Sequence, residues 1–211
     1  NEMVGLRTER LAGGSPVSMV FDLPSDARGD LHVRLDAPND LLAVDNEAWA
    51  VLTEAASREV LLVGGDRLTA RVLAADPRAT VKIASPSEVT PELLASVDCT
   101  LFGGPVPDGM DGLNYAVLGP HFGGPARFAG TLETPSVIGW QRNHPVLRFV
   151  SWDAVSIAKT RKVTELGGLV PVVDADTGPL VLAGERNGGR VVQLAFDPFE
   201  SDLPLRVAWP V

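Results

Sequence analysis

The first 53 residues alternate between apolar and polar side chains over short stretches, a pattern typical of β-strands with one covered face. Strands are predicted over residues 17–21 and 31–35, with turn-forming residues at 24–26 and 28–30. These strands are too few to bury both faces of a sheet, so residues 1–53 are expected to form a partial β-sandwich. The connection that follows lacks the composition of a flexible linker, so we expect this segment to pack on the rest of the chain.

The hydrophobic pattern changes at residue 59. Residues 60–63 form a continuous apolar run, which is typical of a strand covered on both faces, and Gly64-Gly65-Asp66 ends it. A helix capped by Asp66 is predicted next, then a strand over 81–84 and a short helix after Thr90-Pro91. Strands that alternate with helices predict a parallel sheet with crossover connections.

After Gly119 the helical pattern weakens and short apolar segments dominate. Strands are predicted over residues 100–102 and 115–118, before Gly119, and over residues 137–140, 155–158, 169–173, 180–183 and 191–196, after it. Residues 174–178 and 185–189 have the composition of hairpin turns. The expected fold class is therefore α/β: residues 59–211 form a flavodoxin-like parallel sheet with an antiparallel β extension, preceded by the partial β-sandwich.

Composition narrows the possible functions. The chain has 211 residues, 45% of them hydrophobic, and a formal net charge of -9 without any basic run, which argues against a dedicated nucleic-acid surface. Cys99 is the only cysteine, so an internal disulfide is excluded, and its apolar surroundings predict a buried, slowly reacting thiol. We find no membrane-spanning stretch and no signal peptide. Because the chain begins at Asn1 and stops within an apolar segment, we expect a soluble piece of a longer protein.

Residues 178–210 resemble the closing half of class I glutamine amidotransferases. In that family a buried strand leads into a Phe-His-Pro-Glu turn that supplies the general-base histidine, and the corresponding turn here is Phe196-Asp197-Pro198-Phe199-Glu200. The cysteine nucleophile of the family lies in a Gly-x-Cys-x-Gly turn, whose nearest counterpart is Gly119-Pro120-His121-Phe122-Gly123. The resemblance implies this fold with both the thiol and the imidazole replaced, so we expect no glutaminase activity and no enzyme.

Three further motifs resemble the C-terminal region of BatA-like bacterial membrane proteins, which contain a von Willebrand factor A domain. The motifs are residues 39–49 (NDLLAVDNEAW), 144–150 (HPVLRFV) and 200–210 (ESDLPLRVAWP). In that family an amidotransferase-like domain follows a small β-sandwich and precedes a membrane helix. The resemblance implies a non-catalytic interaction or scaffolding module of an envelope-associated protein, without a cofactor. Its partners would be other domains of the full-length protein or envelope proteins, and membrane contact would come only from segments outside this chain.

One cluster of residues is a candidate ligand site. In doubly wound sheets ligands bind beyond the carboxyl ends of the parallel strands. Asp66, His121, Asp197 and Glu200 are predicted to meet there as an acidic cleft for a cation or a polar ligand. The alternative is that these residues cap ordinary turns. No metal site is predicted, because His144 has no second ligand at a suitable spacing and residues 174–178 lack most of a calcium loop.

Two functions therefore stay open. The preferred one is the interaction module. The rival is a small-ligand or metal-binding sensor, or an unconventional hydrolase, that uses a cleft near His121 and Asp197. Hydrogen-bond reach between these two side chains in a concave pocket would favour the rival, whereas turn-capping contacts would favour the interaction module.

Overall fold

The computed structural model describes residues 3–10, 19–21, 23–24, 27–37, 40, 42–52, 57–147 and 150–205. The chain divides into two compact units, unit 1 (Asn1–Ala56) and unit 2 (Ser57–Val211), and each is described by itself. The packing of the N-terminal segment on the rest of the chain stays a prediction. Within the described ranges, no helix has the length and apolar character needed to cross a membrane.

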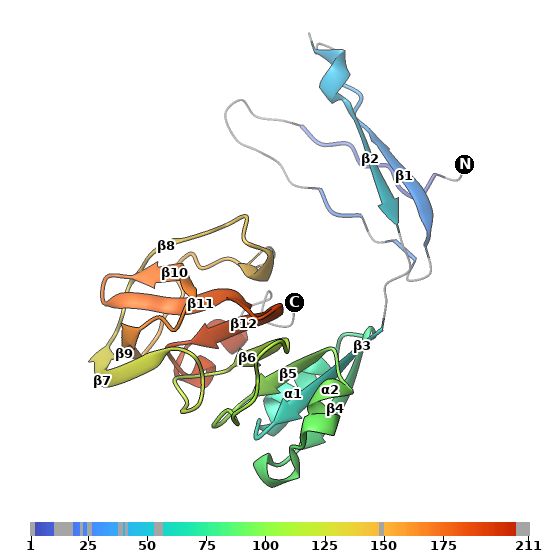
Figure 1. Ribbon diagram of the computed structural model, residues 1–211. Helices are drawn as coiled ribbons and strands as arrows, with labels where there is room; N and C mark the ends of the chain where they lie inside the picture. Colours follow the sequence, from blue (N-terminus) through green and yellow to red (C-terminus); the bar gives the residue numbers. More distant parts are fainter. Residues whose placement is uncertain are drawn as a thin grey trace. The chain divides into compact units, whose positions relative to one another are not determined.

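Unit 1 is built on an antiparallel hairpin of β1 (Gly29–Arg34) and β2 (Glu47–Leu52), with a 3-10 turn η1 (Ala43–Asp45) before β2 (Figure 1). One face of this hairpin carries the apolar side chains of Leu31, Val33, Ala48, Ala50 and Leu52. Of the strand predicted over 17–21, residues 17 and 18 lie outside the described residues, and residues 19–21 form no strand. The hairpin is the only sheet in the described part of unit 1, so a β-sandwich is not confirmed.

Unit 2 contains an eight-stranded mixed sheet, and its parallel part confirms the predicted α/β class. The parallel strands are β3 (Arg58–Val63), β4 (Ala79–Ala84), β5 (Cys99–Phe102), β6 (Tyr115–Val117) and β12 (Gly189–Leu194). They lie in the order β4-β3-β5-β6-β12, which is the strand order of flavodoxin-like sheets.

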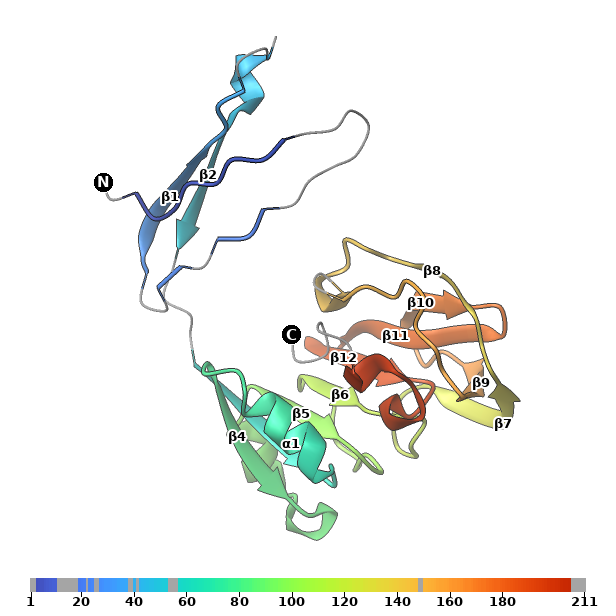
Figure 2. The ribbon, with the colours of Figure 1, turned by 180° about the vertical axis from the view of Figure 1, so that it is seen from behind.

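The helices of unit 2 begin where their capping residues predict. Asp66 caps α1 (Arg67–Leu73), which connects β3 to β4, and α1 lies in front of the parallel strands in the view of Figure 2. The 3-10 turn η2 (Pro86–Glu88) follows β4. Thr90 then caps α2 (Pro91–Ala95), with Pro91 at the first helical position, where its missing N–H costs nothing.

Three antiparallel strands continue the sheet beyond β12, as predicted. They are β11 (Gly178–Arg186), β10 (Val170–Ala175) and β8 (Val137–Trp140). Both hairpin turns lie at the predicted positions. In the β11–β12 turn, Asn187 and Gly188 have φ angles of 48° and 89°, the left-handed conformation that matches the twist of a two-residue hairpin.

In the described part of unit 2, the sequence pattern misses one pair of strands and predicts one strand that does not form. The missed strands, β7 (Arg127–Glu133) and β9 (Lys159–Glu165), form a separate antiparallel ladder. The strand predicted over residues 155–158 is wrong, because only Ile157 makes an isolated bridge, to Ser201. Val155 and Ile157 are buried because they pack in an apolar cluster, and this burial imitates the alternation of a strand.

The sheet separates two apolar clusters. Leu182 of β11 belongs to the first cluster, whereas its neighbours Val181 and Ala183 belong to the second. Because successive residues of a strand point to opposite faces, the two clusters lie on opposite sides of the sheet. The second cluster contains an edge-to-face contact between Trp152 and Phe196, whose ring centroids are 6.2 Å apart. Phe196 thereby anchors the end of β12, immediately before the candidate residue Asp197.

Candidate functional site at the carboxyl edge of the sheet

The strand order brings the sequence-predicted site residues to one edge of the sheet. Asp66 follows β3, His121 follows β6, and Asp197 and Glu200 follow β12. Because β6 and β12 are parallel neighbours, with Val117 opposite Gln193, the loops of His121 and Asp197 leave the sheet side by side. Asp66 is further away along the edge, since β5 lies between β3 and β6.

The place where the strand order reverses, between β3 and β5, is the usual ligand position of flavodoxin-like sheets. Here the backbones that follow the two strands approach closely. A Cβ atom added to Gly103 would lie 2.9 Å from the carbonyl oxygen of Gly64 and 2.9 Å from the Cα of Gly65. The absence of a side chain at Gly103 therefore allows the backbone after β5 to pack directly against the backbone after β3.

Asp66 acts as a helix cap. Its Oδ1 accepts a hydrogen bond of 2.7 Å from the backbone N–H of Thr69, one of the amides that the first turn of α1 leaves without a helical partner. Thr69 itself is buried, so the cap fixes the position at which the helix starts.

His121 lies in a loop held by two glycines with positive φ, Gly119 at 141° and Gly123 at 87°. Its half-buried ring lies over Gly119, where an added Cβ would be 2.9 Å from Nε2. The loop is tied to the segment after β5 by a hydrogen bond of 2.8 Å from the N–H of Val106 to the carbonyl oxygen of Phe122. The side chain of Phe122 is 89% exposed. In this loop the ring of Phe122 is therefore exposed to solvent, and the neighbouring ring of His121 packs on the backbone of Gly119.

Asp197 and Glu200 are also engaged locally. Asp197 caps the 3-10 turn η4 (Pro198–Glu200) by accepting a hydrogen bond of 2.9 Å from the N–H of Phe199. The Glu200 carboxylate lies 3.8 Å from the Nζ of Lys159, and both side chains are about half exposed. Among the residues that the structure describes, no hydrogen bond joins His121 to Asp197, and no three His, Cys, Asp or Glu side chains are arranged to hold a metal ion.

One buried polar residue that the sequence does not single out, Gln193, holds the segment that follows the histidine loop. Gln193 of β12 is completely buried, and its Oε1 accepts a hydrogen bond of 3.0 Å from the N–H of Ala126. A Cβ on Gly124 would come within 2.8 Å of the Gln193 Cδ, so only glycine fits there without a shift. A glutamine inside the apolar run of β12 was the available signal, because buried amides are normally hydrogen-bonded to something specific.

Cys99 lies far from this edge along its strand, since it is the first residue of β5 and the carboxyl edge begins after Phe102. The side chain is partly buried, and burial together with the neighbouring charge of Asp98 raises the pKa of the thiol to about 11. A thiol with this pKa is almost entirely protonated near neutral pH and is a poor nucleophile.

Comparison with known proteins defines the fold. No protein-family model and no curated protein matches the sequence. A cytoplasmic protein from Salmonella typhimurium is similar in structure, with a TM-score of 0.56 and 10% identity, over 72% of this chain and 94% of that chain. A second cytoplasmic protein, from Salmonella typhimurium LT2, has a TM-score of 0.50 and 13% identity, over 82% of this chain and 86% of the other. A ThuA-like protein from Parabacteroides merdae reaches a TM-score of 0.44 at 10% identity, over 66% and 79% of the two chains. At these identities, the first two similarities show a shared α/β fold.

Proposed function

We propose that the chain is a non-catalytic interaction or scaffolding module of a larger, envelope-associated protein of the BatA-like type with a von Willebrand factor A domain. In this proposal unit 2 is a class I glutamine amidotransferase-like domain whose catalytic groups have been replaced, and unit 1 is part of a β-sandwich. The family assignment is supported by the sequence motifs and by the parallel strand order. The functional assignment is supported by the contacts at the carboxyl edge.

The proposal depends on one observation: the two loops after β6 and β12 hold a capping carboxylate and expose two aromatic side chains. In the resembled enzymes these loops supply the nucleophile and the base. Here the Asp197 carboxylate is bound to the N–H of Phe199. The same two loops expose Phe122 at 89% and Phe199 at 43%. Exposed aromatic side chains are typical of protein-binding surfaces, because they bury a large area at little entropic cost. We call Phe122 and Phe199 the aromatic edge.

The absence of catalysis is tested by measuring ammonia release from glutamine by the purified chain. We expect no release above the uncatalysed rate, because the pKa of Cys99 disfavours its thiolate and the thiol lies at the opposite end of β5. Ammonia release that disappears in Cys99→Ser or Asp197→Asn would contradict the proposal.

The interaction itself is tested by placing a photo-crosslinking phenylalanine analogue at position 122 of the full-length protein in its own cell. We expect covalent adducts with another domain or another protein, and we expect Phe199→Ser to weaken them. The matched control is the same analogue at Arg190, whose side chain is 83% exposed at the amino end of β12. If the crosslinking yield is the same at positions 122 and 190, or if no adduct forms at position 122, the aromatic edge is not a binding surface.

The alternative function is binding of a small polar ligand between His121 and Asp197. One observation favours it: these residues follow neighbouring parallel strands at the edge where such folds bind ligands. Calorimetric titration of the chain with Zn²⁺ and with Ca²⁺ tests the cation form of this hypothesis. Heat of binding that disappears in His121→Ala would support it over the interaction module.

A further inference from the structure

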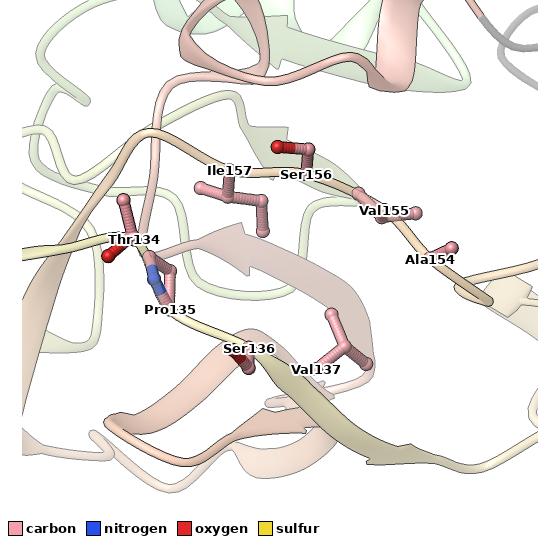
Figure 3. Close-up of a pocket in the computed structure, with 8 residues that line it drawn as sticks. All are labelled: Thr134, Pro135, Ser136, Val137, Ala154, Val155, Ser156 and Ile157. Carbon is pink, nitrogen blue, oxygen red and sulfur yellow. The ribbon is translucent and has the colours of Figure 1, made fainter.

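The antiparallel ladder of β7 and β9 has one packed side and one exposed side. Phe128 and Val163, which lie opposite each other, pack against the first apolar cluster. The ladder ends near Thr134, whose N–H donates to the carbonyl oxygen of Ala158 at 2.8 Å, and beyond this bond the two chains diverge (Figure 3). Most of the other side chains of both strands are exposed to solvent.

Opposite charges face each other at both ends of this ladder. Arg127 lies opposite Glu165, and Lys159 lies opposite Glu133. Lys159 has a second acidic neighbour, since its Nζ lies 3.8 Å from the carboxylate of Glu200. The two ends of the ladder therefore have little net charge, and cross-strand pairs of opposite charge stabilise a sheet.

The middle of the ladder carries positive charge without a facing carboxylate. Lys162 lies opposite Ala129, and Arg161 lies opposite Thr131. Both cationic side chains are exposed. Among the residues that the structure describes, neither of them forms an ion pair. Two neighbouring cations are therefore left for an acceptor outside the ladder.

A β-bulge in β7 positions the guanidinium of Arg161. The register shifts between Ala129 and Thr131, so Gly130 is an extra residue, and its φ of 59° is a left-handed conformation that glycine adopts without strain. The Nε of Arg161 donates a hydrogen bond of 2.8 Å to the carbonyl oxygen of Gly130. This bond holds the guanidinium at β7 and uses only Nε, so both Nη groups can donate to a carboxylate.

The surroundings of these two cations select the class of partner. The chain has a formal net charge of -9, so it repels nucleic acids and strongly anionic membranes at long range. A single carboxylate at Arg161 and Lys162 is attracted, because charges beyond a screening length of about 8 Å contribute little. Small ligands bind in concave pockets, whereas the exposed side of a two-stranded sheet is open. A protein segment with a few carboxylates meets both conditions.

We infer that the exposed side of the β7–β9 ladder binds an acidic segment of a protein partner. One carboxylate of the segment accepts two hydrogen bonds from the Nη groups of Arg161, and Lys162 attracts a second carboxylate. This inference goes beyond the proposed function, because neither cation belongs to the aromatic edge. The crosslinking test at Phe122 and the test of this inference therefore fail independently.

The test is a titration of the isotope-labelled full chain, followed by NMR, with the capped peptide acetyl-Ser-Glu-Ser-Glu-Ser-Glu-amide. We expect saturable shifts of the amides of residues 127–133 and 159–165 and of the Nε–H group of Arg161. The control peptide acetyl-Ser-Gln-Ser-Gln-Ser-Gln-amide has nearly the same shape without the charge and should cause none. No shifts with the acidic peptide, or equal shifts with both peptides, overturn the inference.

Salt and competing anions identify the interaction. Raising the ionic strength from about 0.1 M to about 1 M should strongly weaken binding of the acidic peptide, because the screening length falls from about 10 Å to about 3 Å. Phosphatidylglycerol vesicles and single-stranded oligothymidylate should affect these residues less than the peptide, since the net charge of the chain repels them. Binding that salt does not change, or stronger binding of either polyanion, overturns the inference.

Matched variants locate the binding. Arg161→Gln and Lys162→Gln should each weaken it about two- to fivefold, the range for exposed ion pairs, and Lys162→Glu should weaken it further through repulsion between like charges. Arg190→Gln is the control, because it removes a side chain that is 83% exposed at the amino end of β12, and it should leave the affinity unchanged. If Arg161→Gln does not fold, the Lys162 variants decide, since they break no ion pair of the described residues. Unchanged affinity in Lys162→Glu, or an equal loss in Arg190→Gln, overturns the inference.

Discussion

Replacing Asp197 distinguishes a structural cap from a catalytic group. The carboxylate makes one hydrogen bond, of 2.9 Å, to the N–H of Phe199, and it is exposed. Removing a capping side chain costs about 0.5–2 kcal/mol. Water can partly replace an exposed acceptor, so we expect Asp197→Ala to lower the free energy of unfolding by about 0.5–1 kcal/mol. In a chain of this length that corresponds to a melting temperature lower by about 1–4 °C.

The assay is unfolding in guanidinium chloride followed by tryptophan fluorescence in a Trp49→Phe background. Trp49 is the one tryptophan of unit 1, so the signal then comes from unit 2, where Trp152 contacts Phe196 next to the cap. Asp197→Asn keeps an oxygen acceptor and should stay within about 0.5 kcal/mol of the parent. If Asp197→Ala has the parent's stability, or if the asparagine variant is as unstable as the alanine variant, Asp197 is not a cap and its role must be sought in chemistry.

Two further outcomes follow from buried groups. Gly124→Ala should destabilise unit 2 by about 1–3 kcal/mol, because the new Cβ would lie 2.8 Å from the Gln193 Cδ. Adding Gln193→Ala should recover part of this loss, and a double-mutant cycle of unfolding free energies that shows simple additivity would contradict the overlap. The labelling rate of Cys99 with a thiol reagent should rise about tenfold per pH unit up to a pKa of about 11. Because this folded-state pKa is raised, Cys99 contributes stability that is complete below the unfolded thiol's pKa and is lost as the pH rises towards 11. A plateau in the labelling rate near pH 9 would show an unburied thiol.

The elements that the sequence predicts well are those stabilised by interactions between residues close together in the chain. The cap of α1 at Asp66 and the start of α2 at Thr90-Pro91 depend on side chains within three residues of the helix start. The Asn187-Gly188 turn depends on the conformational freedom of those two residues. Such signals do not require knowledge of any distant partner.

β9 shows why the remaining elements are not predictable in the same way. Its sequence, KTRKVTE, is too charged to suggest a strand against a core. The strand is held by contacts with a residue 35 positions later: the hydroxyl of Thr160 donates to the carbonyl oxygen of Ala195 at 3.0 Å, and the N–H of Arg161 donates to the same oxygen at 2.8 Å. Conversely, Val155 and Ile157 show the apolar alternation of a strand. Their side chains pack in an apolar cluster, but the backbone makes only an isolated bridge, at Ile157, and no strand ladder forms.

For the candidate site, the amino-acid sequence alone determines that Asp66, His121 and Asp197 follow apolar strands, and parallel strand order then requires that they share one edge. Only the tertiary structure decides what those side chains do there. Capping depends on backbone angles that place a carboxylate within 3 Å of one particular N–H, and the exposure of Phe122 depends on the Val106 contact that holds its loop. The hydrogen bonds that Ser136 makes with Asp176 and Ser156 makes with Asp202 depend on tertiary structure in the same way, because the partners are 40 and 46 residues apart in the chain. Hydrogen bonds between segments distant in the chain follow from the packing of the whole unit, and the local sequence does not encode them.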